Sequence, residues 1–557
     1  MRCQTAWQWK IDIVNVSNWL SVSFGDQTYY SPNTDLISLL ENYHKTEFWQ
    51  TTYIEFACVV INNVSGDIKL VRDHFGCEPF FYYLTPWRLY FASSLAELIP
   101  VLKQDGIVVS VNEVELRYML WIGKMLSHPT EVHENTLYNG IKRVKPNHLV
   151  TISKDKITQT QYWNLSNRCD EVIYYKNEDE YLEHFIELLH EGIRLQIGDE
   201  TKIAAECSGG LDSSSIILAA HSLGKSLTLY THLDGEYDPK SKRIRESYFV
   251  EQLVQKYSFK QSNIDADDFN LTQVFDKVTD VLAGQLQSIF PIGANIIHAK
   301  VAADKSKILL SGFGGDECVS GHAYLSVFLP QLLKDGEYRK AWQEYHRYYT
   351  VNNLLKPSVI TQAKTWLRAQ FPDVAEKFAM RNYQQRKQNF TKLGFDLPEY
   401  AARASSVSEF ESRQLIGIDN NHMSYRIEDS ALIARHYGFK YKYPLLYPKL
   451  VEFCNRLPLH MKRQDGLSRI MLRRYLMQAG MPEFVSKPIA KFDGSIMGST
   501  IAKMKKTYPR CFEKQLYSRL DYSEILQQIS NSEPSLSDNI KLYQDLAVLG
   551  LNQYLAK

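Results

Sequence analysis

A glycine-rich turn at residues 207–216, with the sequence Cys-Ser-Gly-Gly-Leu-Asp-Ser-Ser-Ser-Ile, joins a predicted strand at 202–205 to a predicted helix at 214–222. Glycines allow backbone amides to turn toward an anion, and the hydroxyls of Ser208 and Ser213 add hydrogen-bond donors. The helix that follows presents its N-terminal amides and its dipole to the same point. This order of strand, turn and helix predicts a pyrophosphate site.

This turn has two other interpretations, a Walker loop and an ordinary strand-to-helix turn. A Walker loop is excluded, because the Gly-Lys-Ser/Thr ending is missing. An ordinary strand-to-helix turn, in which Asp212 or Ser213 caps the helix, remains the alternative when this segment is taken alone.

Strands and helices alternate beyond this turn. Residues 227–231 favour a further strand and 246–257 a further helix, which predicts a parallel sheet with helices on both faces. Ligands of such sheets bind at the carboxyl ends of the strands. From about Tyr324 the pattern is mostly helical, and it ends in an amphipathic run near Ile540 to Tyr554.

The first 165 residues have a different pattern. Short segments such as 57–61 and 68–71 favour strands, turn residues separate them, and few helices are expected. A polar stretch from about residue 165 to 179 follows, and we expect the domain boundary there.

A second glycine turn, Ser-Gly-Phe-Gly-Gly-Asp-Glu at 311–317, follows another apolar strand at 308–310. It brings a second carboxylate to the same edge of the predicted sheet. Asp212 and Asp316 could then share Mg²⁺, a hard cation that accepts one or two carboxylates together with phosphate oxygens. Either carboxylate alone is more often a helix cap, whereas the pair after two such strands is a more specific signal.

Length and composition exclude several classes of protein. The chain has 557 residues, enough for two large domains, and its 64 Lys and Arg nearly balance its 63 Asp and Glu. This balance provides no basic excess for nucleic acid. The eight cysteines form no Cys-x-x-Cys pair, so neither a zinc ribbon nor a disulfide framework is indicated, and a cytoplasmic location is expected. No segment has the length and apolar character of a membrane span or a signal peptide.

The two glycine turns together resemble the signature of the asparagine synthetase superfamily, which includes asparagine synthetase B-like enzymes, lasso peptide cyclases and β-lactam synthetases. The resemblance spans the chain from about Phe56 to about Gly494. Its further segments are 71–82 and 91–94, similar to the glutaminase-like domain, 136–144 with Tyr162 and Trp163, similar to the last strands of that domain, and 443–447, similar to a segment that normally reads Pro-Phe-Leu-Asp.

This resemblance implies an α/β fold in two domains. An N-terminal Ntn-hydrolase-like, glutaminase-like αββα domain would occupy residues 1–170. An adenine nucleotide α-hydrolase-like synthetase domain, with a parallel sheet and a helical C-terminal part, would occupy residues 180–557.

The resemblance also implies a reaction. Enzymes of this family activate a carboxylate by attack on the α-phosphate of ATP, release pyrophosphate, and leave an acyl-adenylate that an amine opens to an amide. ATP and Mg²⁺ are the expected cofactors, with Asp212 and Asp316 as metal ligands. The residues that match the family's nucleotide site are Ser208, Gly209, Gly210, Asp212, Ser213, Thr231, Ser311, Gly312 and Gly314.

Lys491, within the segment 487–494, resembles a late lysine of the family that neutralises the transition state, and it is an expected catalytic residue. Lys487 is the competing choice. A lysine in a solvated loop is the alternative without catalytic meaning.

The N-terminus departs from the family pattern. A working glutaminase of this family exposes a cysteine as its first residue after Met removal, so that the free α-amine serves as base for the thiolate. Here Arg2 follows Met1, and Cys3 would be exposed only by an additional cut. The segments that shape the glutamine pocket are also missing. We therefore expect Cys3 to be an ordinary small side chain and the first domain to be a structural remnant or a docking surface.

Phe313 is the second departure, since asparagine-forming members place Glu there and β-lactam-forming members place Tyr. A Phe can neither take a proton nor hydrogen-bond an amine. Glu428 resembles the acidic residue that β-lactam-forming relatives pair with that Tyr, so it is a further expected catalytic residue, for orienting or deprotonating the amine. A surface helix residue is its alternative. Tyr447 replaces the usual Asp of the Pro-Phe-Leu-Asp segment.

These departures favour a specialised amide ligase over the synthesis of free asparagine. The first hypothesis is a lasso-peptide-type macrolactam cyclase, in which an Asp or Glu side chain of a precursor peptide is adenylated and closed by the peptide's own N-terminal amine. Its partners would be that peptide and a leader-peptide-binding or protease protein, with no nucleic acid and no membrane. The alternatives are an asparagine synthetase that uses ammonia or glutamine, and a non-catalytic scaffold, against which the intact Asp212 and Asp316 count.

Overall fold

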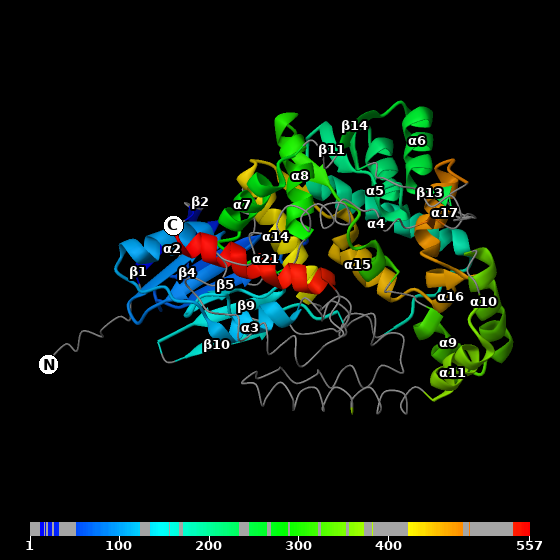
Figure 1. Ribbon diagram of the computed structural model, residues 1–557, viewed down its shortest axis with the longest axis horizontal. Helices are drawn as coiled ribbons and strands as arrows, with labels where there is room; N and C mark the ends of the chain where they lie inside the picture. The colour runs from blue at the N-terminus through cyan, green and yellow to red at the C-terminus, as the bar shows by residue number, and fades with distance from the viewer. Residues whose placement is uncertain are drawn as a thin grey trace.

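In a computed structural model, the chain folds into two parts that lie side by side (Figure 1). The structure describes residues 12–15, 17, 20–24, 27–32, 52–122, 134–154, 156–165, 171–232, 244–264, 269–287, 290–320, 325–352, 356–371, 381, 421–482, 489–490 and 538–557.

Two sheets form the N-terminal part. One has the strand order β1-β7-β6-β8 and the other β10-β9-β5-β4-β3-β2. Buried side chains from both sheets, such as Val59 and Leu70 on one and Phe80 and Phe91 beside the other, form a core between them. The strands are β1 (Asp12–Asn15), β2 (Leu20–Phe24), β3 (Gln27–Ser31), β4 (Ala57–Asn62), β5 (Ile68–Arg72), β6 (Phe81–Leu84), β7 (Arg88–Ala92), β8 (Ile141–Arg143), β9 (His148–Ile152) and β10 (Ile157–Gln161).

Two helices accompany these sheets in the described part of the domain: α2 (Leu95–Gln104) and α3 (Glu113–Ile122). The side chain of Ser94 caps α2 by accepting a hydrogen bond from the backbone amide of Glu97. The helix buries Leu98 and Leu102 with the outer side of β6 and β7. The few helices predicted for this part agree with this arrangement.

A five-stranded sheet with all strands parallel forms the centre of the second part, in the order β14-β12-β11-β15-β16. The first strand in sequence, β11, lies in the middle, and the chain extends the sheet first to one side and then to the other. The order therefore reverses between β11 and β15, and at such a switch point ligands bind beyond the carboxyl ends of the strands. The strands are β11 (Lys202–Glu206), β12 (Ser226–His232), β14 (Lys260–Ile264), β15 (Ile308–Leu310) and β16 (Lys440–Lys442).

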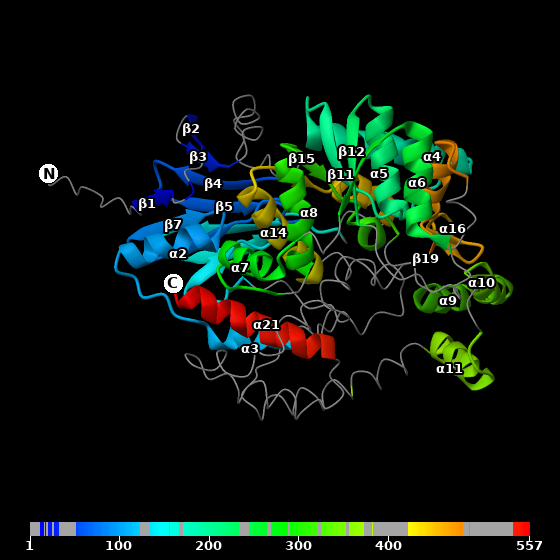
Figure 2. The ribbon, with the colours of Figure 1, turned by 45° about the horizontal axis from the view of Figure 1, so that its top comes forward.

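Helices cover both faces of this sheet (Figure 2). On one face lie α4 (Glu178–Ile197), α5 (Leu211–Ser222), α15 (Pro448–Asn455) and α17 (Ile470–Gln478), and on the other α7 (Leu271–Val281), α8 (Phe290–Ala303) and α14 (Asn421–His436). The remaining described elements are β13 (Ile244–Arg245), α6 (Glu246–Tyr257), η4 (Gly315–Val319), α9 (Leu325–Lys334), α10 (Tyr338–Val351), α11 (Val359–Gln370), η6 (Pro444–Leu446), α16 (Leu459–Lys462), β17 (Arg463–Gln464), β18 (Leu467–Ser468), β19 (Ile489–Ala490) and α21 (Asp538–Leu555).

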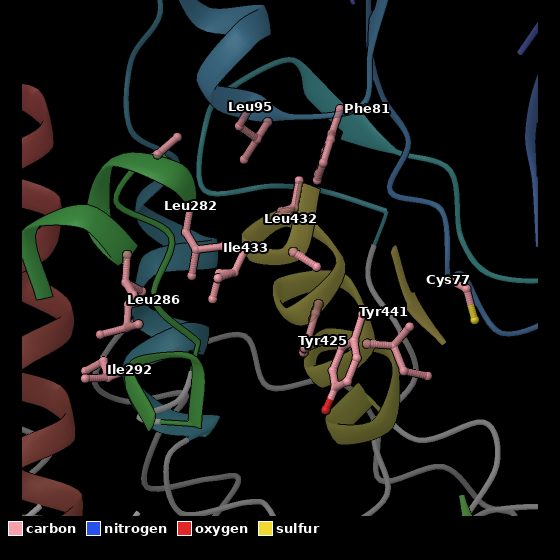
Figure 3. Close-up of a cluster of buried hydrophobic side chains, with 14 of the residues drawn as sticks. Cys77, Phe81, Leu95, Leu282, Leu286, Ile292, Tyr425, Leu432, Ile433 and Tyr441 are labelled. Carbon is pink, nitrogen blue, oxygen red and sulfur yellow. The ribbon is translucent and has the colours of Figure 1, made fainter. Parts of the chain in front are cut away.

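One hydrophobic cluster joins the two parts (Figure 3). Phe81 and Leu95 from the N-terminal part pack in it with Leu432 and Ile433 of α14. The C-terminal helix α21, red in Figure 2, runs along α3, and its Gln544 donates a hydrogen bond to the backbone oxygen of Leu120. The C-terminus of the described chain thus returns to the first domain.

The sequence predictions for the sheet agree closely with these bounds. The predicted helix at 214–222 begins three residues earlier, at Leu211, because the turn before it is shorter than expected. The polar stretch at 165–179 lies between β10 and α4, and we retain the division into residues 1–170 and 180–557 as a proposal. In the described ranges, no helix has the length and apolar character needed to cross a membrane.

Candidate nucleotide site at the carboxyl edge of the sheet

The turn after β11 opens toward the N-terminus of α5. Gly209 has a φ of 75°, a left-handed conformation that favours glycine. Gly210 occupies the N-cap position of α5, and no side chain caps this helix. The alternative that Asp212 or Ser213 is an ordinary cap is therefore wrong, and the first amides of α5 keep their capacity to bind an anion.

Two hydroxyls close this turn. Ser208 Oγ accepts a hydrogen bond from the amide of Gly210 at 3.2 Å and lies 3.2 Å from Ser213 Oγ. Ser213 Oγ in turn lies 3.3 Å from the carbonyl oxygen of Gly210. The structure thus brings together the residues that the sequence predicts for pyrophosphate.

The second glycine turn, after β15, packs directly against the first. A Cβ atom on Gly312 would lie 2.5 Å from the amide nitrogen of Ser213, and one on Gly315 would lie 2.2 Å from Cγ of Asp212. The contact of Gly312 is with backbone, so glycine is required there, whereas a Cβ at position 315 would displace the Asp212 carboxylate. Gly314 caps η4 in a left-handed conformation, with a φ of 102°.

Asp212 and Asp316 converge on one cation, the guanidinium of Arg469. Arg469 Nη1 lies 3.2 Å from Oδ2 of Asp212, and its Nη2 forms an ion pair with Oδ1 of Asp316. Burial lowers the pKa of Arg469, but the two carboxylates outweigh it and raise that pKa overall. The backbone of Arg469, at the N-terminus of α17, is left-handed with a φ of 62°, which is strained for a residue with a side chain.

This arrangement fits the type of ligands that Mg²⁺ requires. The two carboxylates meet at one positive group, and the close approach of Gly315 to Asp212 holds one of them against the second turn. Within the described ranges, no group of three or more His, Cys, Asp or Glu side chains could hold a metal by itself. Two carboxylates with phosphate oxygens remain a sufficient set for Mg²⁺.

Thr231 and Ser311, predicted for the adenosine pocket, lie at the ends of the strands that flank β11. Both are buried, with 1% and 2% of their surface exposed. The Thr231 hydroxyl has no hydrogen-bond partner among the residues that the structure describes. Ser311 Oγ donates to Oε2 of Glu206 at 2.9 Å, and its amide donates to the carbonyl oxygen of Lys442.

Glu206 is a site residue that the sequence reasoning missed. It is the last residue of β11, and the neighbouring positions of this strand are buried and apolar. The only signal in the sequence was an acidic side chain at the end of an apolar strand, immediately before the glycine turn. Arg469 was missed as well, because it lies more than 250 residues from the first turn and no local pattern marks it.

Phe313 is buried next to these groups. The guanidinium carbon of Arg426, on α14, lies 4.1 Å from the centre of the Phe313 ring, and the ring of Tyr443 stands edge-on at 6.1 Å. Phe313 therefore offers a cation–π contact in place of the acid or hydroxyl of its relatives.

Glu428 does not lie where a base for the amine is expected. Its carboxylate forms buried ion pairs with Arg72 at 2.9 Å and Arg143 at 3.0 Å, both from the N-terminal part. Burial raises the pKa of Glu428, but the two arginines lower it more, so the group is a weak proton acceptor. We therefore assign Glu428 to the contact between the domains, and its alternative as a surface helix residue is wrong too, since only 3% of it is exposed.

Several predicted residues lie outside the described ranges. Lys491, its competitor Lys487, and Cys3 belong to this group. The neighbouring strand β19 is described and pairs in parallel with β13. Tyr447 is described and buried, and its ring packs against Gly192 of α4, so the usual carboxylate is replaced by a core side chain.

Comparison with known proteins agrees with this geometry. The Asparagine synthase family matches residues 184–522, and the Glutamine amidotransferase domain matches residues 26–163. A protein of Methanocaldococcus jannaschii, provisionally named glutamine-hydrolysing asparagine synthetase 2, is 25% identical over 54% of this chain and 57% of its own length. Glutamine-hydrolysing asparagine synthetase 3 of Bacillus subtilis is 26% identical over 34% of this chain and 30% of its own. Amidase chry2 of Gibberella zeae is 24% identical over 34% and 27%.

The chain thus spans a little over half of one of these relatives and less than a third of the others. The family match covers most of the second part, including both glycine turns and Arg469, and the smaller match covers most of the first part. The chain belongs to the asparagine synthase family.

Proposed function

We propose that this protein is an ATP-dependent ligase that forms a C–N bond: it activates a carboxylate as an acyl-adenylate, releases pyrophosphate, and transfers the acyl group to an amine with release of AMP. The observation that carries this proposal is the convergence of Asp212 and Asp316, from two glycine turns, at the switch point of a parallel sheet. Membership of the asparagine synthase family supports it.

Different residues of the site would bind the phosphates and the metal ion. The amides at the start of α5, with the hydroxyls of Ser208 and Ser213, would hold the β- and γ-phosphates of ATP. Asp212 and Asp316 would hold Mg²⁺, which supplies positive charge to the phosphate oxygens. Arg469 adds a fixed positive charge at the same point. The rate gain would come from alignment of the reactants and from stabilised charge on the phosphates.

For the substrate, we favour an Asp or Glu side chain of a precursor peptide, closed to a macrolactam by the peptide's own N-terminal amine. Phe313 cannot supply the acid or hydroxyl of asparagine- and β-lactam-forming relatives. Ring closure needs no ammonia, so it needs no glutaminase. The first domain would then serve as a docking surface for a leader-peptide-binding or protease partner.

Asparagine formation from aspartate is the second candidate. The names of the relatives from Methanocaldococcus jannaschii and Bacillus subtilis favour it. In that case ammonia, or glutamine if Cys3 is exposed by an additional cut, would supply the nitrogen.

Mass spectrometry can separate these candidates. Purified protein with ATP and Mg²⁺ is offered either aspartate with ammonia or glutamine, or a linear peptide with a free N-terminus and an internal Asp or Glu, and AMP and product are measured. Peptide-dependent AMP with loss of one water from the peptide supports the cyclase, whereas asparagine supports the second candidate.

The variant Asp212→Ala tests whether the protein is a non-catalytic scaffold. Asp212→Ala should abolish AMP release, while Asp199→Ala, an exposed residue beyond the end of α4, should leave it unchanged. A cellular role that survives Asp212→Ala, with no AMP formed by the unmodified protein from either substrate set, would contradict the ligase.

A further inference from the structure

Glu206 lies beside the second glycine turn, next to Ser311 of the predicted adenosine pocket. Ala205 pairs with Leu310 on the neighbouring strand, so the next residues, Glu206 and Ser311, lie opposite each other beyond the ladder. Their side chains form a hydrogen bond of 2.9 Å. Ser311 Oγ also accepts from the amide of Phe313 at 3.3 Å. Through Ser311, the carboxylate of Glu206 is therefore linked to the turn that carries Phe313.

The surroundings of Glu206 combine charge with aromatic surface. Arg426, from α14, contributes a positive group that stacks on Phe313 and attracts the Glu206 carboxylate. Tyr230, Tyr441 and Tyr443 contribute buried rings on the same side of the sheet. Glu206 itself is half-buried and is the last residue of β11, at the carboxyl edge of the sheet.

The chemistry of this carboxyl suits a proton acceptor. Burial raises the pKa of Glu206, and Tyr441, Arg426 and Ser311 only partly oppose this effect. Tyr230, which pairs with Glu206 across β11 and β12, directs its hydroxyl away to Asp304 at 2.7 Å. A carboxyl with a raised pKa transfers protons near neutral pH more effectively than an ordinary one.

We propose that Glu206 binds the amine that attacks the acyl-adenylate and accepts its proton, since Phe313 stands where asparagine-forming relatives place an acid. This inference rests on the proposed ligase function. The ammonium form of the amine pairs with the Glu206 carboxylate and gives it one proton. The nitrogen lone pair then forms the C–N bond, the C–O bond to the phosphate breaks, and AMP leaves with that electron pair. The second proton lost by the nitrogen goes to water.

The test compares Glu206→Gln with the unmodified enzyme for two nucleophiles. Gln keeps the size of the side chain and an oxygen for Ser311, but it cannot take a proton. With ATP, Mg²⁺ and the carboxylate substrate, amide formation at pH 7 should fall about 100-fold, the lower range for loss of a general base. Formation of a hydroxamate with added hydroxylamine, which is largely unprotonated at pH 7, should stay within about threefold. Equal loss of both products would overturn the proposal and indicate a defect in adenylation.

A binding measurement makes the outcome independent of the natural substrate. Saturation-transfer NMR with glycinamide, a minimal N-terminal amine, is recorded in the presence of AMP. Glycinamide should bind the unmodified protein, and the signal should be lost in Glu206→Gln. The matched control is Glu200→Gln, just before the opposite end of β11, where the carboxylate pairs with Lys307 at the surface.

These two measurements distinguish a failure of the proposed ligase function from a failure of the proposed amine site at Glu206. Absence of AMP release with every carboxylate would contradict the ligase function, yet the loss of glycinamide binding would still support an amine site at Glu206. Equal glycinamide signals in the unmodified protein and in Glu206→Gln, or unchanged amide formation in the variant, would refute the role of Glu206.

Discussion

At the scale of single residues, the most informative contact is the guanidinium of Arg469 between Asp212 and Asp316. Two carboxylates that approach one point repel each other unless a cation lies between them. Arg469 supplies this cation within the chain, and its left-handed backbone shows that the protein accepts strain at this position. The same carboxylates are the proposed ligands of Mg²⁺. The guanidinium and the metal would therefore each offset the repulsion between the same two negative charges.

This leads to a prediction for Arg469→Gln. Without the guanidinium, the free energy of unfolding should fall by about 3 kcal/mol in the absence of divalent cations, because two partly buried carboxylates lose this positive charge. Millimolar Mg²⁺ should restore more stability in this variant than in the unmodified protein, because the metal can occupy the space between the carboxylates. Urea unfolding with and without Mg²⁺ measures both effects.

The control is Arg474→Gln, also on α17, whose guanidinium pairs with the exposed Glu178. It should lose less than about 1 kcal/mol and show no change in its response to Mg²⁺. An Mg²⁺ response in Arg469→Gln no larger than in the unmodified protein would argue against a metal at Asp212 and Asp316.

At the scale of elements, the parallel sheet explains which site residues could be predicted from sequence. Asp212 and Asp316 were predicted because each follows an apolar strand, and parallel strands bring their carboxyl ends to one edge. Arg469 and the ion pairs of Glu428 depend on helices α17 and α14, whose positions relative to the sheet are set by long-range packing. No period or spacing in the sequence encodes those positions, so the sequence did not indicate Arg72 and Arg143 as the partners of Glu428.

The helix α8 supplies a prediction about pH. His298 is fully buried against Phe439 and Tyr441, and burial lowers its pKa to about 3. The unfolded chain therefore binds a proton on this side chain at a higher pH than the folded protein does, so protonation favours unfolding. As the pH falls below about 6.5, the folded protein should lose up to about 5 kcal/mol through this one group.

The variant His298→Phe removes this titration and keeps an aromatic ring. Its free energy of unfolding should change less between pH 7 and pH 4 than that of the unmodified protein, in urea titrations at a series of pH values. His221→Phe, at an exposed position of α5, serves as the control and should keep the original pH dependence. Parallel pH curves for His298→Phe and the unmodified protein would show that His298 is not buried as described.

At the scale of the whole molecule, the two domains are joined by buried polar contacts as well as by a shared core. Glu428 binds Arg72 and Arg143, Lys442 pairs with Glu55, and Trp163 Nε1 donates to Glu452 at 2.9 Å. Arg72 also donates to the carbonyl oxygens of Glu78 and Val144, so the ion pair is built into the turns of the first domain. These contacts and the shared core hold the two domains together.

We therefore expect Glu428→Gln to uncouple the domains. The variant removes the carboxylate that pairs with two buried guanidiniums, and breaking such a pair from one side costs about 3 to 5 kcal/mol. Because the pKa of Glu428 is lowered in the folded protein, its contribution is fully present above the ordinary carboxyl pKa of about 4.3 and is lost as the pH falls through the lowered value. The stability difference between the variant and the unmodified protein should therefore be largest at neutral pH and shrink in acid.

Limited proteolysis and urea unfolding at pH 7 and pH 3 measure this coupling. The variant should be cut faster between the domains and should unfold in two steps, while AMP release under stabilising conditions falls by less than tenfold, because Glu428 contacts neither glycine turn. Glu337→Gln, whose carboxylate forms an exposed pair with Lys340, should match the unmodified protein in every measurement. A loss of AMP release as large as that of Asp212→Ala, with stability unchanged, would contradict this assignment. It would indicate that Glu428 acts on the amine and does not stabilise the contact between the domains.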